Sequence, residues 1–381
     1  WYAKAQFNLG VILGEQGDTE GAIAAYRSIE REDSPEWYAK AQFNLGVILG
    51  EQGDTEGAIA AYRSIEREDS PEWYAKAQFN LGVILGEQGD SAGAIAAYRS
   101  IKREDSPELY AMAQVNLGAA LGKQGDTDGE IAAYRNITRE DSPEWYAKAQ
   151  LYLGITLEEQ GNTEEAISAY RNITRKDSRE QYAKAQVNLG VVLAKQDQLD
   201  EAIATFCNIQ PEDSKESYAK AQLGLSIILE ARGDTEGAIA ACRNVTREDS
   251  RELYAKAKFN LGVTLEAQGD TEGAIAAYRK ITRKDSSELY AMAQFNLGVA
   301  LQEQGKIEEA KQAFSNSRSV FYYQAESQLK ILNCPPDSRS NLAAVYDAIE
   351  SIIQTLFISS YGGIAGENPL KVAHYTRPSI A

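Results

Sequence analysis

A strict period of 36 residues constrains this chain more than any other feature of its sequence. Residues 1–36 recur letter for letter as residues 37–72, and diverging copies follow at the same step up to the one that begins at Leu289. A period of about 20 to 50 residues is the signature of arrays in which each unit packs mainly against its neighbours. We therefore expect a stack of repeated units over residues 1–318 instead of a globular domain around one core.

Each unit predicts two helices. Apolar residues of the first helix recur three and four positions apart, which places them on one helical face: Tyr2, Ala5, Leu9, Ile12 and Leu13. The second helix carries a similar stripe, formed by Ala22, Ile23, Tyr26 and Ile29. Neither helix can bury its stripe alone, so we expect stacked units to share one continuous apolar core.

The residues between the two stripes match the ends of helices. In Asp33-Ser34-Pro35-Glu36, an N-cap residue precedes a proline at the first helical position and an acidic first turn. Gly17 suits the left-handed position that follows a helix, and Asp18-Thr19 then caps the second helix. The pattern predicts an all-α protein.

The unit resembles the tetratricopeptide repeat. The family pattern is matched by Leu9-Gly10, Leu13, Ala22, Tyr26 and the following Ser34-Pro35. The unit departs from the family where Gln6 replaces a tryptophan and Leu13 a tyrosine, and it is longer than the usual repeat of about 34 residues. The resemblance implies a right-handed α-solenoid superhelix of about nine helix-turn-helix repeats, whose first helices line a concave groove that captures peptides. Sel1-like repeats are a related alternative, whereas pentatricopeptide repeats bind RNA and tend to be basic, unlike this chain.

Composition argues against several classes of function. The chain has 56 acidic and 39 basic residues, a net charge of −17, which disfavours binding to nucleic acid or to anionic membranes. No apolar run reaches the roughly 18 residues of a membrane span, and no signal-peptide pattern is present, so we expect a cytoplasmic protein. Three cysteines and one histidine predict no disulfide framework, no metal, no cofactor and no catalysis in this segment. The start at Trp1 predicts a piece of a longer chain.

Two sets of first-helix residues are candidates to line the groove. The first is the pair Phe7 and Val11, which is apolar in every unit. In chaperone-binding members of the family these two positions carry the Lys and Asn of a carboxylate clamp, so we expect no clamp for acidic C-terminal tails. The pair is instead expected to pack between adjacent units.

The second set is the asparagine that precedes Leu-Gly. It resembles the asparagine ladder of the O-GlcNAc transferase repeats, in which stacked amides hold a peptide backbone, since an amide both donates and accepts hydrogen bonds. The alternative is a structural hydrogen bond between helices. The candidates are Asn8, Asn44, Asn80, Asn116, Asn188, Asn260 and Asn296, with interruptions at Tyr152 and Gly224. Lysines four residues earlier are candidates to meet acidic groups of a partner: Lys4, Lys40 and Lys76.

The repeat pattern ends after Phe314. Residues 319–358 predict two capping helices on either side of Cys334-Pro335-Pro336, and residues 359–381 predict a flexible linker and the truncated start of a further domain. The stretch Val372-Ala373-His374-Tyr375-Thr376 is similar to the opening strand of ADP-ribosyltransferase-like domains and to a bacterial family that begins with His-Tyr-Thr. The first resemblance implies that His374 contacts the ribose of NAD.

Three functions follow as hypotheses. The first is a non-enzymatic scaffold that binds an extended peptide or a partner protein in the concave groove. The second is a regulatory or targeting arm of a larger enzyme, an NAD-using transferase whose catalytic domain starts near His374. The third is end-to-end self-association through the near-identical units at the Trp1 end.

Overall fold

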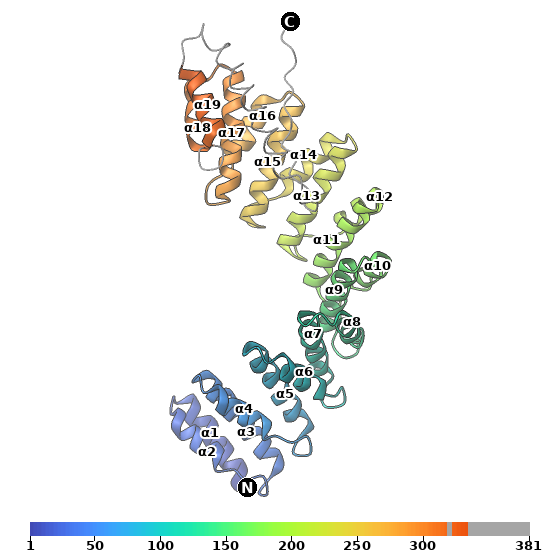
Figure 1. Cartoon of the computed structure of the whole chain (residues 1–381), viewed down its shortest axis with the longest axis vertical. Helices are drawn as coiled ribbons and strands as arrows, with labels where there is room; N and C mark the ends of the chain where they lie inside the picture. Colours follow the sequence, from blue (N-terminus) through green and yellow to red (C-terminus); the bar gives the residue numbers. More distant parts are fainter. Residues whose placement is uncertain (318–321, 334–381) are drawn as a thin grey trace. The chain divides into compact units, whose positions relative to one another are not determined.

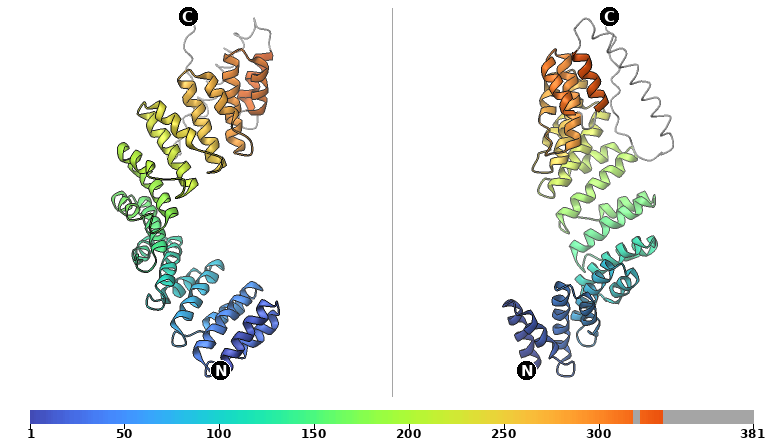
Figure 2. Two further views of the ribbon diagram at one scale, coloured as in Figure 1. Left: turned by 180° about the vertical axis from the view of Figure 1, so that it is seen from behind. Right: turned by 60° about the vertical axis from the view of Figure 1, so that its left-hand side comes forward.

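The computed structural model describes residues 1–317 and 322–333. Every regular element in these residues is an α-helix, as predicted. The chain divides into two compact units, Trp1–Tyr254 and Ala255–Ala381. Figure 1 shows helix pairs that follow one another along each unit, and Figure 2 shows the same helices from two other sides.

Each repeat consists of a long first helix and a shorter second helix. The first helices of residues 1–254 are α1 (Tyr2–Glu15), α3 (Pro35–Glu51), α5 (Pro71–Glu87), α7 (Pro107–Lys123), α9 (Pro143–Glu159), α11 (Arg179–Lys195) and α13 (Lys215–Ala231). The second helices are α2 (Thr19–Arg27), α4 (Thr55–Arg63), α6 (Ser91–Ser100), α8 (Thr127–Arg135), α10 (Thr163–Arg171), α12 (Leu199–Cys207) and α14 (Thr235–Asn244). The remaining described helices are α15 (Arg251–Ala267), α16 (Thr271–Arg279), α17 (Ser287–Glu303), α18 (Ile307–Ser317) and α19 (Tyr322–Asn333).

The helices begin and end where the sequence predicts. Ser34 is the N-cap of α3, and Pro35 is its first residue. Gly17, just after α1, has a left-handed φ of 82°. The carboxylate of Asp18 accepts a hydrogen bond from the backbone N–H of Gly21 at 2.9 Å and so caps α2. Left-handed glycines recur at the same place in most units, so these local signals repeat along the chain.

The core lies between the helix pairs. The second-helix residues Ala22, Ile23, Tyr26 and Ile29 are all at most 6% exposed, as their spacing predicts. Leu45 of α3 is 5% exposed, whereas Leu9, its equivalent in the identical sequence of α1, is 43% exposed. Two identical helices therefore differ in burial because a preceding unit covers only one of them.

A glycine lets the two helices of a unit approach closely. A Cβ atom at Gly46 would lie 2.6 Å from Cε1 of Tyr62, well inside van der Waals contact. The seventh unit has Ser226 in place of this glycine and Cys242 in place of the tyrosine, and both are buried. A larger residue is therefore found at this helix crossing where the aromatic ring is absent.

An arginine in the loop after a second helix ties its unit to the next. Arg139 donates from Nε to Oδ1 of Asp177 at 2.6 Å and from a terminal nitrogen to the backbone oxygen of Asn172 at 2.9 Å. Its guanidinium lies 4.7 Å from the ring centroid of Tyr146. Burial by itself raises the pKa of Asp177, but hydrogen bonds from Arg139 and Thr174 outweigh this effect and hold the pKa below its ordinary value. The contact recurs between later units, for example between Arg175 and Asp213.

Candidate peptide-binding face

The first helices of residues 1–254 form a continuous row. Each first helix from α1 to α11 contacts the next first helix, and each second helix from α2 to α12 packs against the first helices before and after it. Residues spaced by four, three and four positions share one side of a helix. In α3 such a set is exposed or half-buried, namely Lys40, Asn44, Val47 and Glu51. We call these four positions, taken over α1 to α13, the first-helix face.

Five of the seven predicted asparagines lie on this face, Asn260 and Asn296 hold the equivalent positions of α15 and α17, and most of the seven hydrogen-bond to the preceding unit. The side-chain Nδ2 donates to the hydroxyl of a second-helix tyrosine in four places. The distances are 3.2 Å for Asn44 with Tyr26 and for Asn80 with Tyr62, and 3.4 Å for Asn116 with Tyr98 and, in the second compact unit, for Asn296 with Tyr278. The structural hydrogen bond is therefore present at these positions, and it uses one of the two N–H donors of each amide. The side-chain Oδ1 of the first three has no hydrogen-bond partner among the described residues.

The other asparagines are in varied surroundings. Burial and the nearby charge of Glu158 raise the pKa of the Tyr170 hydroxyl, while a hydrogen bond with Asn188 lowers it. Asn8 is exposed on α1, and Asn260 is half-buried on α15. Asparagines at the same repeat position therefore differ in their surroundings from one unit to another.

The two interruptions of the asparagine series coincide with changes in the tyrosine partner. Tyr152 stacks near Tyr134, with ring centroids 5.9 Å apart, and the Tyr134 hydroxyl donates to Glu130 instead. Gly224 lies against Phe206, which has no hydroxyl, and a Cβ at Gly224 would come within 2.8 Å of that ring. At these two positions the usual acceptor is missing or donates to another partner, but the rule is not general, because Asn260 is kept where Cys242 replaces the tyrosine.

Two of the predicted lysines, Lys40 and Lys76, contact residues close to them in sequence, whereas Lys4 lies beside a residue of the next unit. Lys40 Nζ lies 2.6 Å from Oε1 of Glu36 and 4.3 Å from the ring centroid of Trp37. Lys76 makes the same two contacts one unit later, at 2.7 and 4.0 Å. Lys4 is exposed and lies 5.8 Å from the centroid of Trp37. A partner carboxylate at Lys40 or Lys76 would therefore compete with a glutamate of the chain.

The first member of the apolar pair packs between units as predicted, but the second, at the Val11 position, is exposed in the sixth and seventh units, where it is Val191 and Ile227. The ring centroid of Phe7 lies 5.2 Å from that of Trp37 in the next unit and 5.8 Å from that of Tyr26 in its own. Phe43 repeats this arrangement with Tyr62 and Trp73. These side chains are half-buried and join adjacent units.

Two apolar residues of the first-helix face are exposed. Val191 on α11 is 42% exposed and Ile227 on α13 is 61% exposed, whereas the equivalent Val47 and Val83 are half-buried. Gly224 lies three residues before Ile227, on the same side of α13, and contributes no side chain there. Gly224 interrupts the asparagine series, so the sequence marks this position as unusual. The sequence does not, however, indicate that Val191 and Ile227 are exposed. The other exposed large apolar residues in the described ranges lie in or beside α1: Trp1, Tyr2, Leu9 and Ile12.

The charge of the first-helix face changes along the chain. In the first three units its last position is a glutamate: Glu15, Glu51 and Glu87. On α11 and α13 the face contains no carboxylate and three lysines: Lys184, Lys195 and Lys220. Each of these lysines pairs with a glutamate outside the face, at distances of 2.6 to 2.9 Å. The exposed apolar residues therefore lie among cations.

Other kinds of site are absent from the part of the chain that the structure describes. Within residues 1–317 and 322–333, no helix has the length and hydrophobicity to cross a bilayer. The same residues hold no group of three or more His, Cys, Asp and Glu side chains arranged for a metal ion. Helix α19 lies in the stretch assigned to capping helices and packs on α18. The second expected capping helix and His374 lie outside the described residues.

The repeat matches a known family. A family model described as the tetratricopeptide repeat matches residues 7–72, 43–108, 79–144, 151–216, 223–288 and 259–318. No curated protein sequence matches the chain.

Similar solved structures include the following three. A tetratricopeptide repeat protein from Parabacteroides merdae is 18% identical over 68% of this chain and 98% of its own, with a TM-score of 0.39. The apo form of RapI is 16% identical over 86% and 98%, with a TM-score of 0.49. YrrB, a TPR protein with an unusual peptide-binding site, is 18% identical over 52% and 98%, with a TM-score of 0.37. Similarity at this level says nothing about function. The family matches, by contrast, span well over half of the residues, and the chain belongs to the tetratricopeptide repeat family.

Proposed function

We propose that the chain is a protein-interaction scaffold that binds an extended segment of a partner protein along the first-helix face. The observation that carries this proposal is the exposure of Val191 and Ile227 at equivalent positions of two neighbouring first helices. Full burial of such a side chain contributes about 1.5–3 kcal/mol, so covering the exposed part of Ile227 would contribute about 1–2 kcal/mol. An apolar side chain of the partner is the expected occupant.

The charges around this pair define the rest of the partner segment. Lys184, Lys195 and Lys220 surround the apolar residues, and the face has no carboxylate there. A segment with acidic residues on either side of an apolar one would pair with these lysines by exchanging the glutamates that now contact them, Glu180, Glu158 and Glu216. The net charge of −17 opposes this at long range, but salt screens it beyond about 8 Å at physiological ionic strength. The local lysines then decide the interaction.

The asparagines have a more limited part in this proposal than a free amide would have. One N–H of Nδ2 of Asn44, Asn80 and Asn116 stays on its tyrosine, so the amide offers its second N–H and Oδ1, and we assign to Oδ1 the bond from a backbone N–H of the partner. Each such bond contributes about 0.5–1.5 kcal/mol net, and the run works by repetition. Lys4, Lys40 and Lys76 would contact carboxylates of the partner, the last two by exchanging a glutamate of the chain.

A peptide display experiment tests the apolar pair. The whole chain is used to select from a library of short random peptides, and the affinity of selected peptides is measured by fluorescence anisotropy. We expect selected peptides to share a large apolar residue between acidic ones and to bind the Ile227→Ser chain about five- to thirtyfold more weakly. Val47→Ser, at the equivalent but half-buried position, is the matched control. Peptides that bind the Ile227→Ser chain as tightly as the parent would refute the proposal.

A comparison of two triple variants separates ligand contact from structure at the asparagines. Both variants lose the same inter-unit hydrogen bonds, but only the asparagine variant also loses Oδ1. If Oδ1 holds the peptide, the asparagine variant binds peptide more weakly than the tyrosine variant, at equal helicity by circular dichroism. Equal effects would leave the asparagines a structural role alone. The variants are Asn44→Ala, Asn80→Ala and Asn116→Ala together, and Tyr26→Phe, Tyr62→Phe and Tyr98→Phe together.

Self-association is a second candidate, which one observation favours. Leu9 and Ile12 of α1 are 43% and 50% exposed, whereas the identical Leu45 of α3 is buried by the unit before it. A second copy could cover the same residues of α1. Sedimentation equilibrium should then show a dimer that Leu9→Ser with Ile12→Ser dissociates, and a monomeric parent chain would exclude it. Nothing in the described residues or in the family match supports an enzyme that starts near His374.

A further inference from the structure

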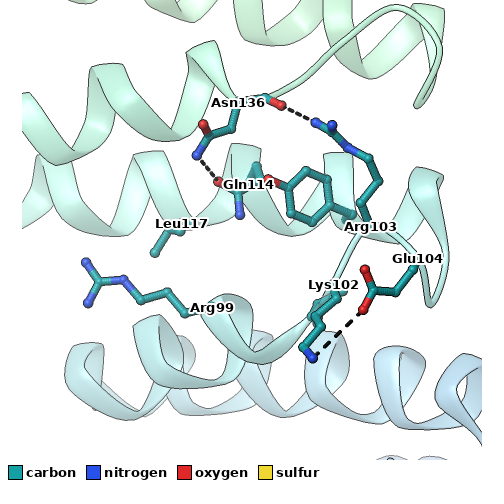
Figure 3. A pocket seen from close by; sticks show the side chains of 9 residues that line it. Arg99, Lys102, Arg103, Glu104, Gln114, Leu117 and Asn136 are labelled. Carbon is teal, nitrogen blue, oxygen red and sulfur yellow. Dashed lines mark hydrogen bonds and ion pairs between the residues drawn. The ribbon is translucent and has the colours of Figure 1, made fainter.

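A cavity of about 470 Å³ lies between the third and fourth repeats. It is lined by the end of α6, the loop after α6, and the side of α7 formed by Tyr110, Gln114 and Leu117. These three residues are spaced by four and three, and their side of α7 is opposite to the first-helix face. Figure 3 shows the side chains around the cavity. The cavity is thus distinct from the first-helix face, and a ligand bound in it is independent of the proposed function.

Three cations line this cavity against one carboxylate. Arg103 is already engaged, with Nε 2.8 Å from Asp141 and a terminal nitrogen 2.6 Å from the backbone oxygen of Asn136. Lys102 has only a long contact of 3.8 Å with Glu104. Glu104 itself is shared, because Arg67 of the preceding unit lies 3.3 Å from the same oxygen. The ammonium group of Lys102 is therefore available to form an ion pair with an external anion.

Arg99 has neither an ion pair nor a side-chain hydrogen bond within the part of the chain that the structure describes. Its equivalents in the next two units, Arg135 and Arg171, each pair with a glutamate on the following second helix. For Arg99 the residue at that place is Gly129. The guanidinium of Arg99 is exposed and is left available for an external anion.

Among residues 1–254, the combination of Lys102 with the unpaired Arg99 occurs in the third unit alone. The position of Lys102 is Glu30 and Glu66 in the two units before it, and Thr138 and Thr174 in the two units after it. Among residues 1–254, the third unit is therefore the one with a cation at this position beside an unpaired arginine.

A buried amide adds a third donor. Gln114 is 6% exposed, and its Oε1 accepts from Nδ2 of Asn136 at 3.4 Å. Its Nε2 has no hydrogen-bond partner in the described residues, and Figure 3 shows this nitrogen directed into the cavity above Arg99 and Lys102. Guanidinium, ammonium and amide N–H are all donors, so their shared ligand is an anion.

We propose that this cavity binds a glutamate carboxylate of a partner protein. Arg99 would hold the two carboxylate oxygens, with Nε2 of Gln114 as a further donor. Figure 3 shows Lys102 extending toward Glu104 and away from the guanidinium of Arg99, so its flexible side chain would turn toward the bound carboxylate. Ile101 and Leu117 supply an apolar wall suited to the methylene stem of a glutamate. Glu104 at the rim disfavours a phosphate, whose charge of about −1.5 to −2 would increase the repulsion.

Side-chain NMR of arginine tests the proposal on the whole chain. The Nε–H signal of Arg99, assigned by its loss in Arg99→Gln, is followed during titration with acetyl-Leu-Glu-Leu-amide. We expect a saturable shift with this peptide and none with acetyl-Leu-Gln-Leu-amide. Lys102→Glu should weaken binding at least about tenfold, because an attracting charge becomes a repelling one. This variant restores the residue of the first two units, so it should fold.

The controls decide between this site and general attraction. Arg63→Gln removes the equivalent unpaired arginine of the second unit, beside Glu66, and should leave the affinity unchanged. An equal loss in Arg63→Gln, or no loss in Lys102→Glu, overturns the proposal. Tighter binding of a phosphoserine peptide, or equally tight binding of propionate, overturns the assignment to a glutamate of a partner protein.

Discussion

Replacing Gly82 by alanine should destabilise the array, although glycine is a poor helix former. A Cβ at Gly82 would lie 2.5 Å from Cε1 of Tyr98. That ring is only 5% exposed, packs 6.0 Å from the ring of Phe79, and holds Asn116 through its hydroxyl, so it cannot move away freely. Overpacking costs about 1–3 kcal/mol, and the change from glycine to alanine returns about 0.5–1 kcal/mol. The expected net loss is about 1–2 kcal/mol.

A control for this prediction lies one turn further along the same helix. Gly86 is exposed, and a Cβ there would meet only Cβ of Ala94, at an ordinary 3.9 Å. Gly86→Ala should therefore stabilise the array by about 0.5–1 kcal/mol through helix propensity alone. The two variants have the same composition, so the sign of their effects isolates the close approach of Gly82 to Tyr98.

Guanidinium unfolding followed by the circular dichroism of the helices measures both effects. Because contacts in a repeat array are mainly between neighbours, unfolding need not be two-state, and hydrogen exchange in α5 and α6 localises the change. Gly82→Ser with Tyr98→Cys copies the natural pair Ser226 and Cys242 and should cost less than the sum of its single changes. If Gly82→Ala stabilises the array as Gly86→Ala does, steric conflict with Tyr98 does not govern stability at this crossing.

Three further outcomes are expected. Asp177→Asn should make stability less sensitive to acid: the folded pKa of Asp177 is lowered, so its contribution is present above the unfolded value of about 3.9 and is lost as pH falls through the folded value. Unfolding midpoints between about pH 7 and pH 3 measure this. Glu266→Gln should stabilise the array at neutral pH, because burial raises the pKa of Glu266 and the folded chain disfavours the carboxylate above about 4.3; melting in acid should show no such gain. Asn80→Ala should cost about 0.5–1.5 kcal/mol by depriving Tyr62 of its hydrogen bond, and unchanged denaturant midpoints would contradict this.

The helices and their ends could be predicted because their signals act within a few residues. Gly17, Asp18 and Pro35 each determine a helix end through their own backbone or nearest neighbours, and the structure confirms all three. The pairing of Arg139 with Asp177 could not be predicted in this way. The two residues are 38 positions apart in polar loops, where neither periodicity nor a cap motif points from one to the other.

Only part of the candidate peptide-binding face could be predicted from the sequence. The hydrogen bond between asparagine and tyrosine had a signal within the chain itself, since Phe206 and Gly224 depart from the pattern together. The exposure of Ile227 had none, because Ile227 and the half-buried Val47 are both β-branched apolar residues at one repeat position. The exposed fraction of this side chain depends on how adjacent helices pack, and the residue type at one position does not predict that packing. The free guanidinium of Arg99 likewise depends on Gly129, a residue of the next unit.

The contacts between units connect fixed positions of neighbouring repeats, as between Asn44 and Tyr26 or between Arg139 and Asp177. Inserting or deleting one whole repeat restores each such partnership with the next copy, whereas losing a few residues would break several. Residues 1–36 and 37–72 are identical, so unequal recombination between their coding sequences changes the array by one whole repeat. Array length is therefore a heritable trait that can change in a single event without a misfolded intermediate. The cavity at Lys102 lies outside these two repeats, so the same event would leave it intact.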